Sequence, residues 1–502
     1  MSYKSPDILS ENAKKLLNDY IHNVDNLKAK ERLKIPIQEM PTLDPKIRGC
    51  NQEEVAIGYT VEEARVEAMR CLECVKQTCI DGCPVNIDIP RFIRHIAHGE
   101  FQNASDVIKE ASLLPSICGR VCPQETQCQQ KCKVGLVHKD IDQAVAIGRL
   151  ERFVADWERE QGNVKVPHVK PETGKKVAII GSGPAGLVVA ADVRREGHAV
   201  TIFEAFHKLG GVMRYGIPEF RLPNSIVDEE IDTLIKMGVE IKKNYVVGRT
   251  KKLTDLIEKD GYDAVFIGTG AGLPIFMGIE GENLVGVFSA NEYLTRANLM
   301  RAFDKKNSAT PIYPSKIVAV LGGGNVAMDA ARMALRLGAE KVYVVYRRTE
   351  KEMPARKEEV AHAKEEGIEF MFLTNAKKIL GNEKGKVSSM ECLKYELGEP
   401  DSSGRRRPLE IKGSEFILDV DTVIVAIGNG SNPLIKQTTP GLETNKWGNV
   451  IVDEKQKASM DRVFAGGDIV LGAATVILAM GEGRKAAAGI NQMLAEEIGQ
   501  EN

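Results

Sequence analysis

The sequence predicts an α/β protein in which a helical, cysteine-rich segment precedes two nested units of alternating strands and helices. The segments KKVAIIGSGPAGLVVAADVRREGHAVTIFE (175–204) and SKIVAVLGGGNVAMDAARMALRLGAEKVYVVYRR (315–348) share one plan. Each has an apolar strand, a glycine-rich turn, an alanine-rich helix and a second strand. Eight of the ten cysteines lie between Cys71 and Cys132, in a stretch with short helical patterns and no clear strand. A chain of 502 residues is long enough for several domains, each with its own core.

The composition excludes several classes of protein. Lys+Arg 68 against Asp+Glu 70 gives a net charge of -2, so no basic field is available for nucleic acid. The longest uncharged apolar stretch, from Ile469 to Met480, is too short to span a bilayer. The first residues, MSYKSPDILSENAKK, lack the apolar core of a secretory signal. We therefore expect a soluble, cytoplasmic chain with no membrane insertion and no nucleic-acid partner.

The two echoing segments are predicted to be nested. The strand ends VFIGTGA (265–271) and VIVAIGN (423–429) also match, and VFAGGD (463–468) followed by a helix would return the chain to the first unit. The second unit is thus inserted into the first. The first 50 residues are polar, with a helical pattern that runs into KIPIQEMPTLDP, and are interpreted as an arm.

The first unit has the glycine pattern of a dinucleotide-binding turn. Gly181, Gly183 and Gly186 follow an apolar strand and open a helix, where a pyrophosphate can approach the backbone and the helix N-terminus. The acid expected on the adenosine ribose is Glu204, at the end of the second strand.

The second unit differs at the position that reads the ribose. Its turn is Gly322-x-Gly324-x-x-Ala327, an allowed variant because the third position needs only a small residue. Arg347 and Arg348 stand where the first unit has its acid. Guanidinium groups there can clamp a 2′-phosphate, which favours NADPH over NADH. The alternative is that the two arginines belong to a solvated loop.

The cysteines form two compact runs. They are Cys71-x2-Cys74-x4-Cys79-x3-Cys83-Pro84 and Cys118-x3-Cys122-Pro123-x5-Cys128-x3-Cys132. Such runs can hold zinc or iron–sulfur clusters, and the terminal Cys-Pro favours two [4Fe–4S] clusters over zinc. No cysteine lies between Cys132 and Cys392, so no dithiol is available beside a flavin. The isolated Cys50 and Cys392 are interpreted as packed residues.

Several long motifs resemble the NADPH-dependent glutamate synthase small-subunit family, which includes the large subunit of the NADH-dependent reduced ferredoxin:NADP⁺ oxidoreductase and the N-terminal half of dihydropyrimidine dehydrogenase. The similarity covers the chain from about Tyr59 onward, and CIDGCPVNIDIP is most similar to the ferredoxin:NADP⁺ oxidoreductase branch. The motifs are CLECVKQTCIDGCPVNIDIPRFI, LPSICGRVCPQETQCQQKC, AIGRLERFVADWE, GSGPAGL, LGGVMRYGIPEFRLP and AGGDIVLGAATVILAMGEGR.

The resemblance implies a helical iron–sulfur domain followed by two nested Rossmann-like domains for FAD and NADPH. The expected boundaries are an arm (1–50), the helical domain with two [4Fe–4S] clusters (51–170), the FAD domain (171–300), the NADPH domain (301–430) and the FAD return (431–502). The implied FAD residues are Gly181, Ser182, Gly183, Pro184, Ala185, Gly186, Glu204, Gly210, Gly211, Gly270, Gly467, Asp468, Ala474, Thr475 and Val476. The implied NADPH residues are Gly322, Gly324, Asn325, Val326, Ala327, Arg347, Arg348, Ala426 and Gly428. No side chain is assigned a catalytic role, since hydride transfer belongs to the cofactors.

The resemblance also implies how the clusters are held. By the pattern of dihydropyrimidine dehydrogenase, one cluster has four cysteines, the other has three cysteines and Glu151, and Cys118 is not a ligand. The two sets are Cys71, Cys74, Cys79 and Cys132, and Cys83, Cys122, Cys128 and Glu151. The alternative is that all eight cysteines are ligands and Glu151 is a solvated helix residue.

The expected function is an oxidoreductase subunit that moves electrons between NADPH and iron–sulfur clusters through FAD. Its expected partners are a second redox subunit and ferredoxin, with electron bifurcation as one form of the reaction. One alternative is the electron-supplying small subunit of a glutamate synthase. An alternative of another class is a zinc-bearing, nucleotide-sensing scaffold.

Overall fold

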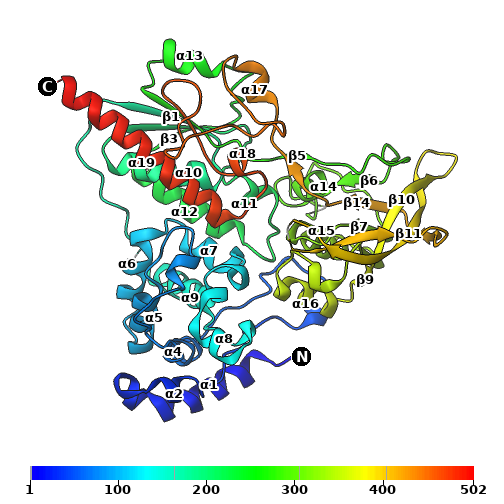
Figure 1. Cartoon of the computed structure of the whole chain (residues 1–502), viewed down its shortest axis with the longest axis horizontal. Coiled ribbons are helices and arrows are strands. Elements are labelled where there is room, and N and C mark those ends of the chain that lie inside the picture. Colours follow the sequence, from blue (N-terminus) through cyan, green and yellow to red (C-terminus); the bar gives the residue numbers. More distant parts are fainter. Residues whose placement is uncertain (1–2, 163, 305, 403, 502) are drawn as a thin grey trace.

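A computed structural model describes residues 3–162, 164–304, 306–402 and 404–501. Figure 1 shows a helical region at the lower left, one sheet above it and a second sheet with its own helices to the right. The helical region and the two sheets correspond to the three predicted parts. In the described residues, no helix has the length and apolar character that a bilayer crossing requires.

The cysteine-rich region folds entirely as helices and turns, as its sequence predicts. Helix α4 begins with a capping box between Thr60 and Glu63, and Gly99 caps the C-terminal end of α5 with a φ of 79°, which is favourable for glycine. Phe92, Ile93 and Ile96 form the buried face of α5. The elements are α4 (Val61–Met69), η2 (Ile80–Gly82), α5 (Ile89–His98), α6 (Phe101–Ala111), α7 (Pro115–Val121), η3 (Gln124–Thr126), η4 (Gln129–Lys131), α8 (Lys133–His138), η5 (Ile141–Gln143) and α9 (Ile147–Glu160).

The predicted N-terminal arm is packed against this helical region. Leu17 is buried, and the buried Arg32 donates hydrogen bonds to the carbonyl oxygens of Met69 and Cys71. Its elements are α1 (Pro6–Tyr20), η1 (Ile21–Asn26), α2 (Ala29–Arg32) and α3 (Pro45–Arg48). The segment is therefore part of the helical domain, because its apolar residues close the core beside α4.

The first sheet is parallel and has the order β16-β4-β1-β2-β3. Its strands are β1 (Lys176–Ile180), β2 (Ala199–Phe203), β3 (Glu240–Lys242), β4 (Ala264–Ile267) and β16 (Val463–Ala465). Its helices are α10 (Pro184–Arg195), α11 (Val212–Tyr215), α12 (Asn224–Lys236), α13 (Leu253–Glu258), α17 (Leu434–Thr438), α18 (Asp468–Leu471) and α19 (Val476–Glu501). Strand β16 returns after the whole second unit, which confirms the predicted nesting.

The second sheet is also parallel, with the order β6-β14-β7-β8-β9. Its strands are β6 (Val287–Ser289), β7 (Ile317–Leu321), β8 (Lys341–Tyr346), β9 (Glu369–Phe372) and β14 (Thr422–Val425), and its helices are α14 (Ala290–Ala297), α15 (Asn325–Arg336), η6 (Glu350–Glu352) and α16 (Lys357–Glu365). Because β6 and α14 belong to this unit, it begins before the expected boundary at residue 301. A short antiparallel ribbon of β5 (Leu273–Pro274) and β15 (Asn429–Gly430) lies where the chain passes between the two units.

An antiparallel sheet is inserted before β14, and the sequence motifs did not indicate it. It consists of β10 (Thr374–Gly381), β11 (Val387–Pro400), β12 (Arg406–Glu410) and β13 (Phe416–Asp419). Figure 1 shows β10 and β11 at the outer edge of the second unit, away from the helical domain.

Candidate functional site

The turn between β1 and α10 is shaped to receive a dinucleotide. Gly181 has a φ of 99°, and a Cβ there would lie 2.5 Å from the Gly268 carbonyl oxygen. A Cβ on Gly186 would lie 2.0 Å from the Gly181 carbonyl oxygen, so the helix approaches the turn as closely as glycine allows. A Cβ on Gly183 or Gly270 would meet nothing within 4 Å. The open space above the turn fits a bound pyrophosphate.

Glu204 lies at the end of β2 and contacts this turn directly. One of its carboxylate oxygens accepts a hydrogen bond from the Ser182 backbone nitrogen at 3.0 Å, and the other accepts from the Phe206 nitrogen at 2.8 Å. The Ser182 hydroxyl donates to Glu204 and accepts from the Gly210 nitrogen at 3.1 Å. The carboxylate therefore braces the turn, and both of its oxygens accept hydrogen bonds from the protein.

The other implied flavin residues surround the same turn. A Cβ on Gly211 would lie 2.8 Å from the Gly183 Cα, and one on Gly467 would lie 3.0 Å from the Ala185 Cβ. Asp468 is the first residue of α18. Ala474, Thr475 and Val476 lead into α19, which packs on α10. The fold thus gathers every implied segment at the carboxyl ends of β1, β2, β4 and β16.

Tyr215 and Thr269 belong to this region, and the sequence did not single them out. Burial, with contributions from Asp468 and Glu204, raises the pKa of Tyr215 to about 12, and burial raises the pKa of Asp468 to about 6. The hydroxyl of Thr269 is buried without a hydrogen-bond partner in the described part of the chain. The only available sequence signals were the aromatic residue after Gly211 and the threonine between two glycines.

We expect Glu204→Ala to lower the affinity for FAD by about tenfold, because it removes hydrogen bonds to a charged group. Iron content should stay unchanged, since the cysteines lie in another part of the fold. Flavin and iron per chain are measured after gel filtration, with Glu196→Ala at the end of α10 as control, a partly exposed residue that pairs with Lys170. Loss of both cofactors would indicate misfolding, and full FAD retention would remove Glu204 from the site.

The turn between β7 and α15 repeats the arrangement in the second unit. A Cβ on Gly322 would lie 2.3 Å from the Ala426 carbonyl oxygen, whereas one on Gly428 would meet nothing within 4 Å. Ala327 is fully buried in α15, as the small third residue should be. The remaining implied residues of the turn, Asn325 and Val326, are the first two of α15.

The two arginines after β8 have different environments. Arg348 is buried, forms an ion pair with Asp401 at 2.8 Å and donates to the Arg406 carbonyl oxygen at 2.8 Å. Arg347 is exposed, and its guanidinium makes no hydrogen bond or ion pair with any described residue. Only one of the two arginines is therefore available to a ligand. Arg347 can meet a 2′-phosphate, while Arg348 ties the turn to the β11–β12 hairpin.

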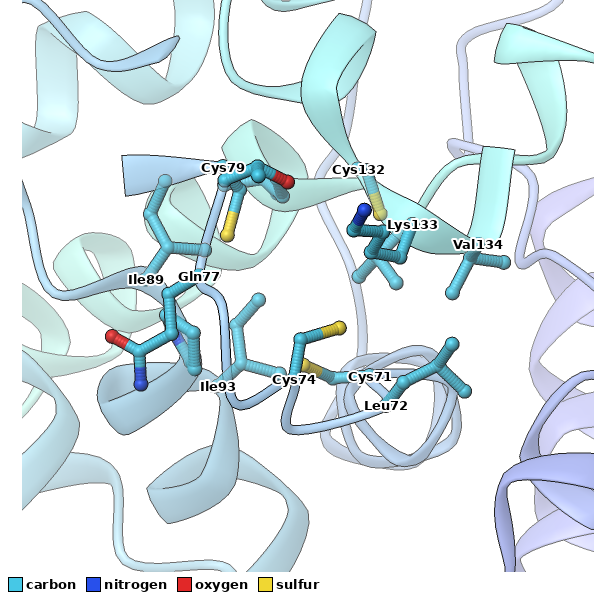
Figure 2. Close-up of a pocket in the computed structure, with 14 residues that line it drawn as sticks. Cys71, Leu72, Cys74, Gln77, Cys79, Ile89, Ile93, Cys132, Lys133 and Val134 are labelled. Atoms are coloured by element: carbon cyan, nitrogen blue, oxygen red, sulfur yellow. The ribbon is translucent and has the colours of Figure 1, made fainter. Parts of the chain in front are cut away.

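Four cysteines line one pocket at the edge of the helical domain. Figure 2 shows the thiols of Cys71, Cys74, Cys79 and Cys132 around one space, with Ile89 and Ile93 beside it. This outer set corresponds to the predicted all-cysteine ligand set. Val75, in the loop beside Cys74, is fully exposed. Among the described residues, no three His, Cys, Asp or Glu side chains form a group that could hold a single metal ion.

The other four cysteines of the two runs, Cys83, Cys118, Cys122 and Cys128, are here called the inner set and lie beside the first dinucleotide unit. Cys118, Cys122 and Cys128 are buried, and the Cys118 sulfur lies 3.4 Å from the sulfur of Met480 in α19. A Cβ on Gly481 would lie 3.0 Å from the carbonyl oxygen of Pro84, which follows Cys83. The inner set is thus in direct contact with the helix that begins at the implied flavin segment.

Glu151 of α9 lies close to the inner set. Its side chain is buried, and Oε1 has no hydrogen-bond partner in the described part of the chain. Burial raises its pKa to about 8. Burial also raises the pKa of Cys83 to about 11, and the Glu151 carboxylate adds to that effect. An unpaired buried carboxylate beside buried thiols fits a site completed by a cationic group.

The thiols of the outer set likewise fit a cationic group. Burial raises the pKa values of Cys71 and Cys79 to about 12, with smaller contributions from neighbouring thiols. Thiolates gathered in this way are stable only when bound to metal. Eight thiols and one buried carboxylate oxygen without a partner in the described residues fit iron–sulfur ligation.

Two family models match the chain. The pyridine nucleotide-disulphide oxidoreductase model matches residues 175–483, and the model of dihydropyrimidine dehydrogenase domain II, 4Fe-4S cluster, matches residues 48–163. The prediction of [4Fe–4S] clusters is thereby confirmed, and the zinc alternative is not supported. The first match also confirms the predicted FAD and NADPH cofactors.

Curated relatives span most of the chain. The glutamate synthase [NADPH] small chain of Escherichia coli (strain K12) is 37% identical over 461 residues, covering 89% of this chain and 95% of the relative. The NADP(+)-dependent formate dehydrogenase subunit beta of Moorella thermoacetica is 40% identical over 446 residues, covering 84% of this chain. The matched region spans 60% of the length of that relative.

Solved structures agree on the fold of the two nested units. FprA of Mycobacterium tuberculosis in complex with NADPH superimposes with a TM-score of 0.54 at 21% identity. The match covers 65% of this chain and 86% of that one. The α/β architecture with nested dinucleotide-binding units is confirmed.

Proposed function

The chain belongs to the pyridine nucleotide-disulphide oxidoreductase family, in the group that includes the glutamate synthase small chains, and we propose that it relays electrons between NADPH and a partner protein at the outer cysteine set. It is an NADPH-dependent oxidoreductase subunit with FAD and iron–sulfur cofactors. When bound, FAD exchanges a hydride with NADPH, and iron–sulfur clusters carry single electrons. The protein contributes position, shielding from water and control of charge.

The contact between Cys118 and Met480 carries this proposal. It joins the inner cysteine set to α19, whose first residue belongs to the implied flavin segment. The outer set lies one short helical turn from the inner set, since η2 separates Cys79 from Cys83 and η4 separates Cys132 from Cys128. The outer set is partly exposed at Cys74 and Cys79. This order supports entry of electrons at the flavin unit and exit at the outer set.

Anaerobic titration with NADPH tests the proposal. We expect NADPH to bleach the flavin absorbance and then the broad sulfide-to-iron absorbance, with NADH much less effective. The control is dithionite, which reduces both cofactors without the nucleotide site. Clusters that dithionite reduces but NADPH leaves oxidised, while the flavin is bleached, would overturn the proposed relay.

The surface around the outer set supports an acidic electron-carrier protein, such as ferredoxin, as the partner. Lys76 and Lys133 flank Cys74, and their ammonium groups form no ion pair within the described part of the chain. Lys131 is exposed and donates to the Asp81 carbonyl oxygen, so its charge is not neutralised there. Such a positive rim accelerates encounters with acidic proteins.

We expect the double substitution Lys76→Glu with Lys133→Glu to slow electron transfer to an acidic ferredoxin by about tenfold at low salt. The effect should shrink at high salt because surface charges are screened. Ferredoxin-dependent turnover is compared with NADPH reduction of the enzyme's own flavin. The matched control is Lys384→Glu, on the β10–β11 turn at the outer edge of the second unit. If the double variant and Lys384→Glu lose the same fraction of ferredoxin-dependent turnover, the surface around the outer set is not the docking site.

A second candidate is the electron-supplying subunit of an NADPH-dependent glutamate synthase. The small chains of Escherichia coli and Azospirillum brasilense support it, since the matched regions cover 95% and 94% of their lengths. Isolation of the native complex separates the candidates. A large partner with glutaminase activity would favour glutamate synthase, whereas a second flavoprotein subunit would favour a ferredoxin-linked, electron-bifurcating enzyme.

A further inference from the structure

A loop of the N-terminal segment leaves the helical domain and returns to it. Residues 42–56, here called the hook, are closed at their base by an antiparallel bridge between Thr42 and Ala56. The Leu43 nitrogen donates to the Val55 carbonyl oxygen at 2.9 Å within the same base. Helix α3 forms the tip, and Figure 1 shows this blue stretch beside α16 of the second unit.

The base of the hook is fixed to the iron–sulfur domain. The Gln38 nitrogen, just before the hook, donates to Glu67 of α4 at 2.8 Å, and its carbonyl oxygen accepts from the Tyr59 hydroxyl at 2.6 Å. Arg152 of α9 donates to the Ala56 carbonyl oxygen at 2.7 Å. Buried hydrogen bonds of this kind hold the base in one place.

The tip of the hook binds the second dinucleotide unit. Arg48 pairs with Glu365 at 2.6 Å and with Glu366 at 3.0 Å, both at the end of α16. The Asn51 carbonyl oxygen accepts from Arg336, the last residue of α15, at 2.9 Å. The tip therefore holds the C-terminal ends of both helices.

Arg48 connects the two ends of the hook. Its guanidinium donates to the Leu43 carbonyl oxygen in the base at 3.2 Å, while its other nitrogens reach the second unit. Its side chain and that of Glu366 are fully buried, and Glu366 is shared with Arg332 at 2.7 Å and Arg336 at 2.8 Å. Removing one partner of such a buried ionic group is costly, because the others lose part of their compensation.

A loop of the flavin unit meets the hook on the same helix. Phe220 lies against the guanidinium of Arg336, with the ring centroid 3.9 Å from its central carbon, and Arg221 pairs with Asp329 of α15 at 2.7 Å. The Val55 nitrogen of the hook donates to the Phe220 carbonyl oxygen at 2.9 Å. Helix α15 is thus held by the helical domain and by the flavin unit together.

We propose that the hook positions the NADPH unit for hydride transfer, with Arg48 as its positioning residue. Helix α15 begins at the Gly322–Gly324 turn, and its held end lies about 16 Å along its axis from that turn. A shift at the held end therefore moves the nucleotide relative to the flavin. A displacement of about 1 Å can slow a reaction by about a hundredfold without removing any contact to the substrate. The inference rests on the proposed NADPH site in this unit.

The test is Arg48→Ala in the full chain loaded with FAD and iron. We expect flavin reduction at saturating NADPH to slow by about tenfold or more, while the Kd for NADPH changes by less than about threefold. Hydrogen exchange should rise in α3 and at the ends of α15 and α16, with no change in flavin or iron content. The matched control is Lys46→Ala, an exposed residue of the same short helix, which should leave all values unchanged.

Two further variants keep the proposal testable if Arg48→Ala does not fold. Glu365→Gln removes one of the two carboxylate charges at the end of α16 that pair with Arg48. It should slow flavin reduction by a smaller factor than Arg48→Ala does. Arg48→Lys keeps the charge but loses the planar set of donors of the guanidinium, so its rate of flavin reduction should lie between those of Arg48→Ala and the unsubstituted protein. Unchanged flavin reduction in Glu365→Gln and Arg48→Lys, or a loss of NADPH affinity equal to the loss of rate, would overturn the proposal.

The same measurements separate this inference from the proposed function. If the unsubstituted protein binds NADPH but does not reduce its flavin, the proposed function fails and the hook is not at fault. If the unsubstituted protein is active and Arg48→Ala is equally active, only the role of the hook fails.

Discussion

Arg347→Ala is expected to raise the KM for NADPH by about 10- to 100-fold and to leave the KM for NADH nearly unchanged. Only NADPH carries the 2′-phosphate, and one charge-assisted hydrogen bond contributes on that scale. Arg347 is exposed at the end of β8, and its guanidinium is unpaired in the part of the chain that the structure describes. Steady-state kinetics with both nucleotides measure the change in selectivity.

Arg348→Ala is the internal control for this experiment. Arg348 already forms an ion pair with Asp401 and donates to the Arg406 carbonyl oxygen, so its loss should loosen the turn. The KM values for NADPH and NADH should then rise by similar factors, smaller than the rise for NADPH in Arg347→Ala. If Arg348→Ala changes selectivity more than Arg347→Ala does, the division of roles is wrong. Equal losses for both nucleotides in Arg347→Ala would assign that residue to a solvated loop.

The nested units could be predicted because their signals are local. A glycine turn between an apolar strand and a helix fits within about 30 residues, so Gly181, Glu204, Gly322 and Arg347 can be found from the sequence. The separate roles of Arg347 and Arg348 could not be found in this way. They depend on a hairpin whose Asp401 lies 53 positions further along the chain.

The contacts that hold α15 and α16 against the hook and the flavin unit join residues even more distant in sequence. Arg48 and Glu366 are 318 positions apart, and neither stands in a recognisable motif. Phe220 and Arg221 belong to the segment LGGVMRYGIPEFRLP, which resembles a flavin motif, yet their side chains contact α15 of the other unit. Local patterns specify elements, whereas charged side chains at an interface acquire partners only when the fold brings them together.

The assignment of Glu151 to the inner cluster leads to the second large expected effect. Glu151→Ala should lower iron from about eight atoms per chain to about four, because one of two cubanes loses a ligand. Its buried Oε1 has no partner among the described residues, whereas the Cys118 sulfur already contacts Met480 and Cys122. Cys118→Ser should therefore retain both clusters. Iron analysis and low-temperature EPR of the dithionite-reduced proteins measure the difference.

Matched substitutions decide between loss of a ligand and loss of packing. Glu151→Gln keeps a carbonyl oxygen at the same position and should retain more iron than Glu151→Ala, with an altered EPR signal from the inner cluster. Cys128→Ser provides the positive control, since both assignments count that thiol as a ligand. If Cys118→Ser loses a cluster while Glu151→Ala is silent, eight thiolates hold the two clusters. In that case the orphaned carboxylate of Glu151 must be balanced by some other group.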